Sequence, residues 1–208
     1  MNKRLLTRAI AATTLTLTTL CLAAPARALS FDLSRSSGRT AVPSILFPGE
    51  NGLSLTVTAD PTNRNVFQNK KGLGVTIDVK GDSDINEVDG NGVAETLILT
   101  FSERVKLSSA VFSRVQRNDQ FQLFVDDNLV LNGTQSNFDI SGKGHGRRVD
   151  FSSMIVGRKF GFFAQQANDD FLLSSVDVTS VPVPGAVLPG LVGLGTAVVR
   201  KKRTKEVS

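Results

Sequence analysis

The sequence predicts an all-β fold, an antiparallel β-sandwich of the jelly-roll type, flanked by an N-terminal signal peptide and a C-terminal hydrophobic helix. Three observations predict it. Apolar and polar residues alternate with a period of two in many short runs. Each run is bounded by Gly, Asn, Asp or Ser, which favour turns. No segment between the two ends has both the length and the composition of a long helix, and many short strands without intervening helices are typical of sandwiches.

About nine or ten strands are expected. In chain order the alternating runs cover residues 53–59, 75–79, 97–101, 105–115, 121–125, 129–131, 138–140, 149–151, 160–164 and 172–178. In Val105–Val115 the apolar residues lie four apart, as in a helix, but the Ser and Val content favours a strand. The turn sequence Asp126-Asp127-Asn128 predicts a hairpin between Phe121–Val125 and Leu129–Leu131.

The middle of the chain has the size of a single domain. Residues 52–180 are assigned to the sandwich, and residues 29–51, with two prolines and many Ser and Gly, to an irregular lead-in. A domain of about 150 residues buries roughly 68–70% of the surface of its unfolded chain, enough for one core. All 13 aromatic residues are Phe, which brings apolar area without a hydrogen-bonding group, so most of the rings are expected in the core.

Residues 1–28 have the three parts of a secretory signal peptide. Lys3, Arg4 and Arg8 precede the uncharged stretch Ala9–Ala24, and Ala26-Arg27-Ala28 fits a signal peptidase site. The mature chain is therefore expected to begin near Leu29, outside the cytoplasm. The single cysteine of the chain, Cys21, lies inside this leader, so the mature protein would have neither disulfides nor a Cys nucleophile.

Residues 181–208 form a second targeting segment. Ala186–Val199 is uncharged but only 14 residues long, so a helix there covers about 21 Å of a hydrocarbon layer of about 30 Å. The basic run Arg200–Lys205 would stay on the cytoplasmic side. The sequence thus predicts a short inner-membrane segment with the domain outside. A C-terminal core helix with a solvated basic end is the alternative.

This tail resembles the PEP-CTERM sorting signals, most closely the variant whose motif begins Pro-Thr-Pro-Ala. The matching residues are Pro182, Pro184, Gly185, Leu188, Pro189 and Gly190, followed by Leu191 and the basic run. Val183 and Gly185 depart from the usual Thr and Ala. The resemblance implies recognition by an exosortase-like membrane enzyme. It also implies a transient stay in the inner membrane and delivery to the cell surface, the outer envelope or the extracellular matrix.

The positive charge of the chain belongs to its ends. The leader carries four of the 24 basic residues and the tail five, which leaves 15 basic and 18 acidic residues and a net charge of −3 in residues 29–180. The formal charge of +5 is therefore no sign of a nucleic-acid surface, and no nucleic-acid partner is expected.

An Asp-rich segment, Asp82–Glu95, is the candidate metal site. Oxygen ligands of this kind suit Ca²⁺, and the candidate ligands are Asp82, Asp84, Asn86, Asp89, Asn91 and Glu95. The segment is not an EF-hand loop, because Glu87 and Val93 stand where Gly and a bidentate Glu are needed. The alternative is a solvated acidic loop without an ion. Asp169, far away in the sequence, is expected to take no part.

The sequence contains no residue pattern that is typical of a known type of catalytic site. His145 is the only histidine and no G-x-S-x-G sequence occurs, so neither a His metal cluster nor a nucleophile-elbow triad is expected. Residues 72–127 resemble a surface domain found beneath such tails, for which no activity is implied. We expect an exported, non-catalytic structural or adhesive protein, with Ca²⁺ as its one candidate cofactor and exopolysaccharide as a candidate partner. Two alternatives stay open. One is a carbohydrate-binding module, although the Trp and Tyr on which such modules commonly stack sugars are absent. The other is a small secreted hydrolase.

Overall fold

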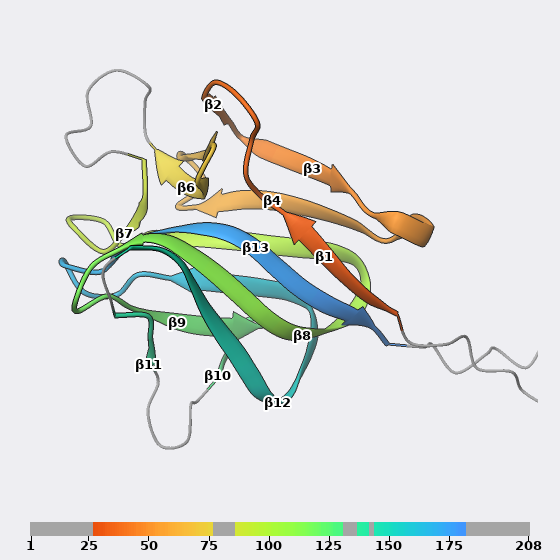
Figure 1. Ribbon diagram of the computed structural model, residues 1–208. Coiled ribbons are helices and arrows are strands. Elements are labelled where there is room, and N and C mark those ends of the chain that lie inside the picture. Colours follow the sequence, from red (N-terminus) through yellow and green to blue (C-terminus); the bar gives the residue numbers. More distant parts are fainter. Residues whose placement is uncertain (1–26, 77–85, 131–136, 142–143, 182–208) are drawn as a thin grey trace, which may run out of the picture. The chain divides into compact units, whose positions relative to one another are not determined.

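The computed structural model describes residues 27–76, 86–130, 137–141 and 144–181, except the side chains of residues 144–145 and 152–154. These residues form 13 strands and one 3₁₀ turn, η1 (Glu50–Gly52) (Figure 1). The strands are β1 (Ala28–Asp32), β2 (Thr40–Val42), β3 (Ser44–Pro48), β4 (Ser54–Asp60), β5 (Asn65–Asn69), β6 (Gly72–Thr76), β7 (Val88–Asp89), β8 (Thr96–Val115), β9 (Gln120–Val125), β10 (Asn128–Val130), β11 (Asn137–Asp139), β12 (Gly144–Phe163) and β13 (Asp170–Ser180).

Every strand pairing among the described residues is antiparallel, so the predicted all-β antiparallel class is confirmed. The described residues belong to one compact unit, Pro25–Pro182. Among them no helix has the length and apolarity needed to cross a bilayer. The expected signal peptide, apart from Arg27 and Ala28, and the expected sorting segment, apart from Val181, lie outside the described residues.

Two 20-residue strands, β8 and β12, divide the sheet into two arms. The first half of β8, Thr96–Phe101, pairs with β4, and its second half pairs with β13. The two halves are separated by the exposed residues Ser102, Glu103 and Arg104. The first arm is β3–β4–β8–β12–β9–β10, and the second arm is β12–β8–β13–β6–β5–β2, with β1 also paired to β13.

Phenylalanine rings from the two arms contact each other and form the centre of the core. Phe112, on the second half of β8, lies 4.7 Å from the ring of Phe121 on β9 and 5.9 Å from that of Phe162 on β12. Phe31 of β1 meets Phe101 edge-to-face at 5.6 Å. Each fully buried Phe contributes about 1.5–3 kcal/mol. Face-to-face packing of the two arms is compatible with the predicted sandwich.

The prediction of an irregular lead-in over residues 29–51 is wrong. Three strands, β1, β2 and β3, lie in this segment. Phe31 and Leu33 are buried against the core because the chain here alternates apolar and polar residues. The two prolines are tolerated because Pro43 lies between β2 and β3, and Pro48 ends β3, a strand paired on one side only.

The strand predicted over Val105–Val115 is confirmed, and it is continuous with the one predicted at residues 97–101. Its helix-like spacing of apolar residues has a local cause. The pairing with β13 changes register between Leu107 and Ser109, and Arg114 has a positive φ of 60°. Irregularities of this kind move the next side chain to the other face, so buried residues no longer follow strict alternation.

The predicted hairpin between β9 and β10 is also confirmed. Val125 pairs with Asn128, and the two intervening residues, Asp126 and Asp127, have φ values of 47° and 67°. Two successive positive φ values are typical of a type I′ turn, whose twist matches that of the flanking strands. One Asp126 carboxylate oxygen accepts the N–H groups of Arg158 at 2.9 Å and Lys159 at 3.0 Å.

Candidate functional site

One end of the sheet gathers acidic residues from three connections. Figure 1 shows β7 and the start of β9 at this end. Asp89 of β7 pairs with Asp170 at the start of β13. The Gly90 N–H donates to the Asp169 carbonyl at 3.1 Å, and the Gln120 N–H donates to the Asp169 carboxylate at 3.1 Å. We call this region the acidic end and define it by Glu87, Asp89, Glu95, Asp119, Asp169 and Asp170, all buried except the half-buried Asp170.

Four of the six predicted calcium ligands lie at or beside the acidic end, and the other two, Asp82 and Asp84, lie outside the described residues. Asp89 and Glu95 are buried, Asn86 is half-buried and Asn91 is exposed. The Asn91 N–H donates to the Asp89 carboxylate at 2.7 Å. Within the described ranges, no three carboxylate, His or Cys side chains are close enough together to hold a metal ion. The calcium site over Asp82–Glu95 therefore stays a prediction.

Glu95 joins three parts of the fold. Its carboxylate forms an ion pair with Arg64 at 3.5 Å, in which both side chains are less than 10% exposed. It also accepts the Asp89 N–H at 3.3 Å. The Glu95 N–H donates to the Asp89 carbonyl at 3.0 Å, and the Glu95 carbonyl accepts from the Ala164 N–H at 3.1 Å. Glu95 thus ties β7 to the β4–β5 turn and to the end of β12. The sequence analysis missed Arg64, since nothing near it signals a partner 31 positions away.

Asp119 is a fully buried carboxylate with one oxygen left over. One of its carboxylate oxygens accepts the Gln116 N–H. The other, Oδ1, is buried and has no hydrogen-bond partner among the described residues. Burial, together with the charges of Asp170 and Asp169, raises the pKa of Asp119 to about 6, although the amides of Gln116 and Asp170 act in the opposite direction. A carboxyl group whose neighbours are other carboxylates is easier to protonate than one beside a cation.

Asp169 and Asp170 complete the group. Burial raises the pKa of Asp169, with the charge of Asp170 adding to it, against the hydrogen bonds from the amides of Gln166 and Gln120. Asp170 accepts a hydrogen bond from the Gln116 side chain at 2.7 Å, and its second oxygen is buried without a hydrogen-bond partner in the described part of the chain. Although Asp169 is distant from the acidic segment in the sequence, β13 begins beside β7 and the Asp169 carbonyl accepts the Gly90 N–H. The expectation that Asp169 takes no part in a calcium site over Asp82–Glu95 stays a prediction.

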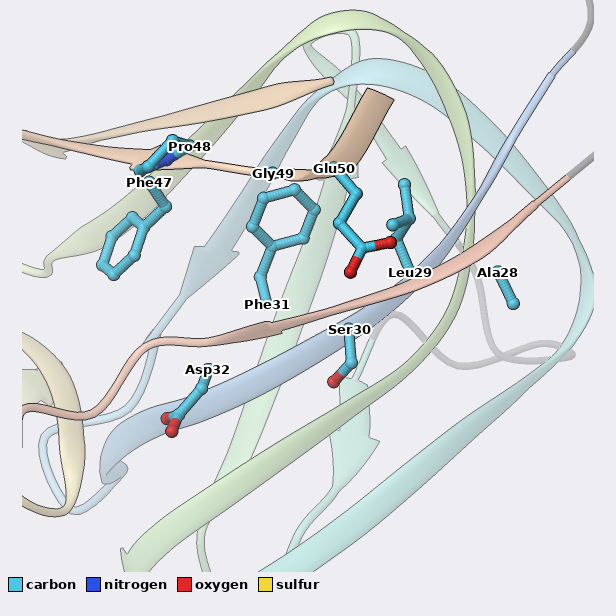
Figure 2. Close-up of a pocket in the computed structure, with 9 residues that line it drawn as sticks. All are labelled: Ala28, Leu29, Ser30, Phe31, Asp32, Phe47, Pro48, Gly49 and Glu50. Atoms are coloured by element: carbon cyan, nitrogen blue, oxygen red, sulfur yellow. The ribbon is translucent and has the colours of Figure 1, made fainter. Parts of the chain in front are cut away.

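A cavity of about 550 Å³ lies between β1 and the segment Phe47–Glu50 (Figure 2). Its lining includes the Phe31 and Phe47 rings and the Asp32 and Glu50 carboxylates. Figure 2 shows the Phe31 ring close to Gly49 and the Glu50 side chain beside Leu29. A Cβ atom on Gly49 would lie 2.8 Å from the Phe31 ring, so only glycine allows this approach. The cavity offers apolar area, two carboxylates and the Ser30 hydroxyl, and its lining includes neither a histidine nor a lysine.

A second cavity of about 410 Å³ opens on the outer surface of the first arm. The half-buried rings of Phe124 and Phe163 flank it, with centroids 6.0 Å apart in edge-to-face geometry. Asp60, Asp127 and Lys159 also line it, and the Lys159 ammonium lies 2.7 Å from the Asp127 carboxylate. The cavity therefore combines apolar ring area with charged hydrogen-bonding groups.

The chain was compared with known proteins. No family model matches it, and neither a curated protein nor a solved structure was found to be similar.

Proposed function

We propose that this chain is an exported, non-catalytic β-sandwich of jelly-roll type that serves a structural or adhesive role at the bacterial cell surface. A signal peptidase removes residues 1–28, and an exosortase-like enzyme processes the tail from Pro182 onward. The observation that carries the proposal is where the described strands begin and end. The first described strand starts at Ala28, the last residue of the predicted leader, and the last described strand ends at Ser180, two residues before the Pro182 of the sorting motif.

The two ends of the unit lie side by side. β1 pairs with β13 from Ala28↔Thr179 to Asp32↔Ser175. Beyond that register, the Ser180 N–H donates to the Arg27 carbonyl at 3.0 Å. The first and last described residues of the unit, Arg27 and Val181, therefore lie close together. This arrangement suits a domain that is passed across a membrane and then held by its C-terminus.

Replacing both Pro182 and Pro184 with Ala tests the sorting step in a bacterium that carries an exosortase-like enzyme. Export should continue, and the variant should remain in the inner-membrane fraction at full length, while the wild type reaches the surface in a shorter form. Fractionation followed by immunoblotting measures this. Wild-type protein that is found in the cytoplasm, or a variant that is sorted like the wild type, would contradict the proposal. The matched control is Pro43→Ala, between β2 and β3, which should be sorted normally.

Carbohydrate binding is the second candidate function, and the cavity at Phe124 and Phe163 favours it. An aromatic ring can stack on the apolar face of a sugar, while Asp127, Lys159 and Asp60 can bond its hydroxyl groups. The test is a titration with the exopolysaccharide of the producing bacterium. The Phe124→Ala/Phe163→Ala double variant should bind at least tenfold more weakly, whereas Phe47→Ala, in the other cavity, should bind like the wild type. Equal binding by all three proteins, or by none, would exclude this cavity as a sugar site.

A further inference from the structure

The acidic end contains two buried carboxylate oxygen atoms whose hydrogen-bonding capacity is not used by the described residues. Oδ1 of Asp119 and Oδ1 of Asp170 are both enclosed, and neither has a hydrogen-bond partner among the described residues. A buried carboxylate oxygen without a partner is costly, so native proteins nearly always satisfy such atoms with a donor, water or an ion. Two of them on turns that are hydrogen-bonded to each other mark a place where a donor or an ion is missing.

Gln116 shows that the two carboxylates are neighbours. Its backbone N–H donates to Asp119, and its side-chain amide donates to Asp170 at 2.7 Å. A further hydrogen bond, from the Asn118 side chain to the Asn168 carbonyl at 3.4 Å, joins the same two turns. The turn before β9 and the turn before β13 are thus held together around the carboxylates, with Asp169 bonded to both turns through the N–H groups of Gln120 and Gln166.

None of the ion pairs within the described part of the chain involves Asp119, Asp169 or Asp170. Arg114, at the end of β8, is already paired with Glu87. The two linked turns thus carry three carboxylates, and two of these carboxylates have an unused oxygen. Together they form a hard and negatively charged donor set. Such a set suits Ca²⁺, which accepts six to eight oxygen ligands in a flexible geometry and takes some of them from water and backbone carbonyls.

We propose that Asp119 and Asp170 bind a calcium ion between the two turns, with Asp169 fixing the turns around it. This site is distinct from the loop Asp82–Glu95 and does not depend on the proposed cell-surface function. It has two carboxylate ligands, with water and backbone oxygens completing the shell, which agrees with the finding that no three acidic side chains within the described ranges converge on one point. The ion would supply both unused oxygens with one partner.

Thermal unfolding of the full chain in detergent tests the site, in 2 mM CaCl₂, in EGTA and in MgCl₂ of equal ionic strength. Wild type should unfold about 5–10 °C higher in Ca²⁺ than in EGTA if the ion is at a hundredfold excess over its Kd. Asp119→Asn and Asp170→Asn should each lose most of that shift. Both variants keep the shape of the side chain and remove a buried charge, so they should fold in EGTA.

Asp84→Asn separates this site from the loop. It should keep the calcium-dependent shift if the ion lies at Asp119 and Asp170, and equilibrium dialysis with radioactive calcium should show one bound ion fewer for Asp119→Asn than for the wild type. The exposed Asp150→Asn is the matched control and should behave like the wild type. The proposal is overturned if the wild type shows no shift that Mg²⁺ cannot mimic, or if Asp119→Asn and Asp170→Asn both retain it.

Discussion

At the residue scale, burial among like charges makes the stability contribution of Asp119 depend on pH. Its pKa in the folded protein is about 6, against a usual value of 3.8. Because the pKa is higher in the folded protein than in the unfolded chain, protonation of Asp119 favours the folded state. This stabilising contribution is fully present below about pH 4 and is lost as the pH rises through 6. The difference between these two pKa values corresponds to about 2–3 kcal/mol of unfolding free energy.

Asp119→Asn should remove this dependence in the calcium-free protein. In EGTA the variant should be more stable than the wild type by about 2 kcal/mol at pH 8, since it carries no buried charge, and the gain should vanish toward pH 4. Urea denaturation at several pH values measures the difference. A constant difference across the range would mean that Asp119 is not buried in charged form.

Glu95 offers a second test at this scale. Removing one partner of a buried ion pair leaves the other uncompensated, so Glu95→Ala should lower the unfolding free energy by about 3–5 kcal/mol. The loss should be the same with calcium and in EGTA, because it comes from Arg64 and the Asp89 N–H. The exposed Glu103→Ala is the control and should change stability by less than about 0.5 kcal/mol. If the loss appears only with calcium, Glu95 is a metal ligand instead.

At the scale of elements, the β9–β10 hairpin is a turn in which two Asp residues play different roles. Asp126 accepts backbone N–H groups from β12, whereas among the described residues the Asp127 side chain forms an exposed ion pair with Lys159. Asp126→Ala should therefore cost about 2 kcal/mol, from lost hydrogen bonds and a positive φ. Asp127→Gly should gain about 0.5 kcal/mol, since glycine suits the second position of a type I′ turn and exposed ion pairs contribute little. Urea denaturation of both variants measures these changes in unfolding free energy. Equal changes for the two variants would contradict the roles assigned to Asp126 and Asp127.

Alternation of apolar residues predicted segments of the long strands β8 and β12 and both strands of the hairpin, because each segment satisfies the period of two locally. It failed for β2 and β3, where strands of three to five residues next to prolines give too short a pattern. It also divided both β8 and β12 in two. In β8 the exposed residues at the bend resemble a loop. A bend within a strand is decided by which partners it pairs with, and sequence spacing does not contain that information.

Sequence analysis predicted only those residues of the candidate site that are neighbours in the sequence. The cluster Asp82–Glu95 stands out because its residues are neighbours in the sequence. Asp119 and Asp170 lie 51 positions apart and become neighbours because the start of β13 pairs with the end of β8, just before the turn that carries Asp119. Arg64 likewise reaches Glu95 through the packing of the β4–β5 turn. Such pairs are made by topology, and each residue on its own looks like an ordinary surface acid or base.

For the whole molecule, the leader and the tail should both be dispensable to the fold. Removal of residues 1–28 leaves Leu29–Asp32 paired with β13, and removal of residues 181–208 takes no residue from any described strand. Deletion of Val181–Ser208 should therefore release a folded protein outside the inner membrane, whose N-terminus is near Leu29. Protease resistance, circular dichroism and N-terminal sequencing measure this. An unfolded truncation product, or one that begins at Met1, would contradict the assignment.

The place of β13 in the sheet has a mechanical consequence. This strand lies between β8 on one side and β1 and β6 on the other, and the chain leaves it directly toward the tail. If the C-terminus is anchored as proposed, a force that pulls on it would act along the axis of β13. The hydrogen bonds to β8 and β1 lie across that axis and would be loaded together in shear, so the anchoring strand would resist extraction far better than an edge strand peeled off one bond at a time.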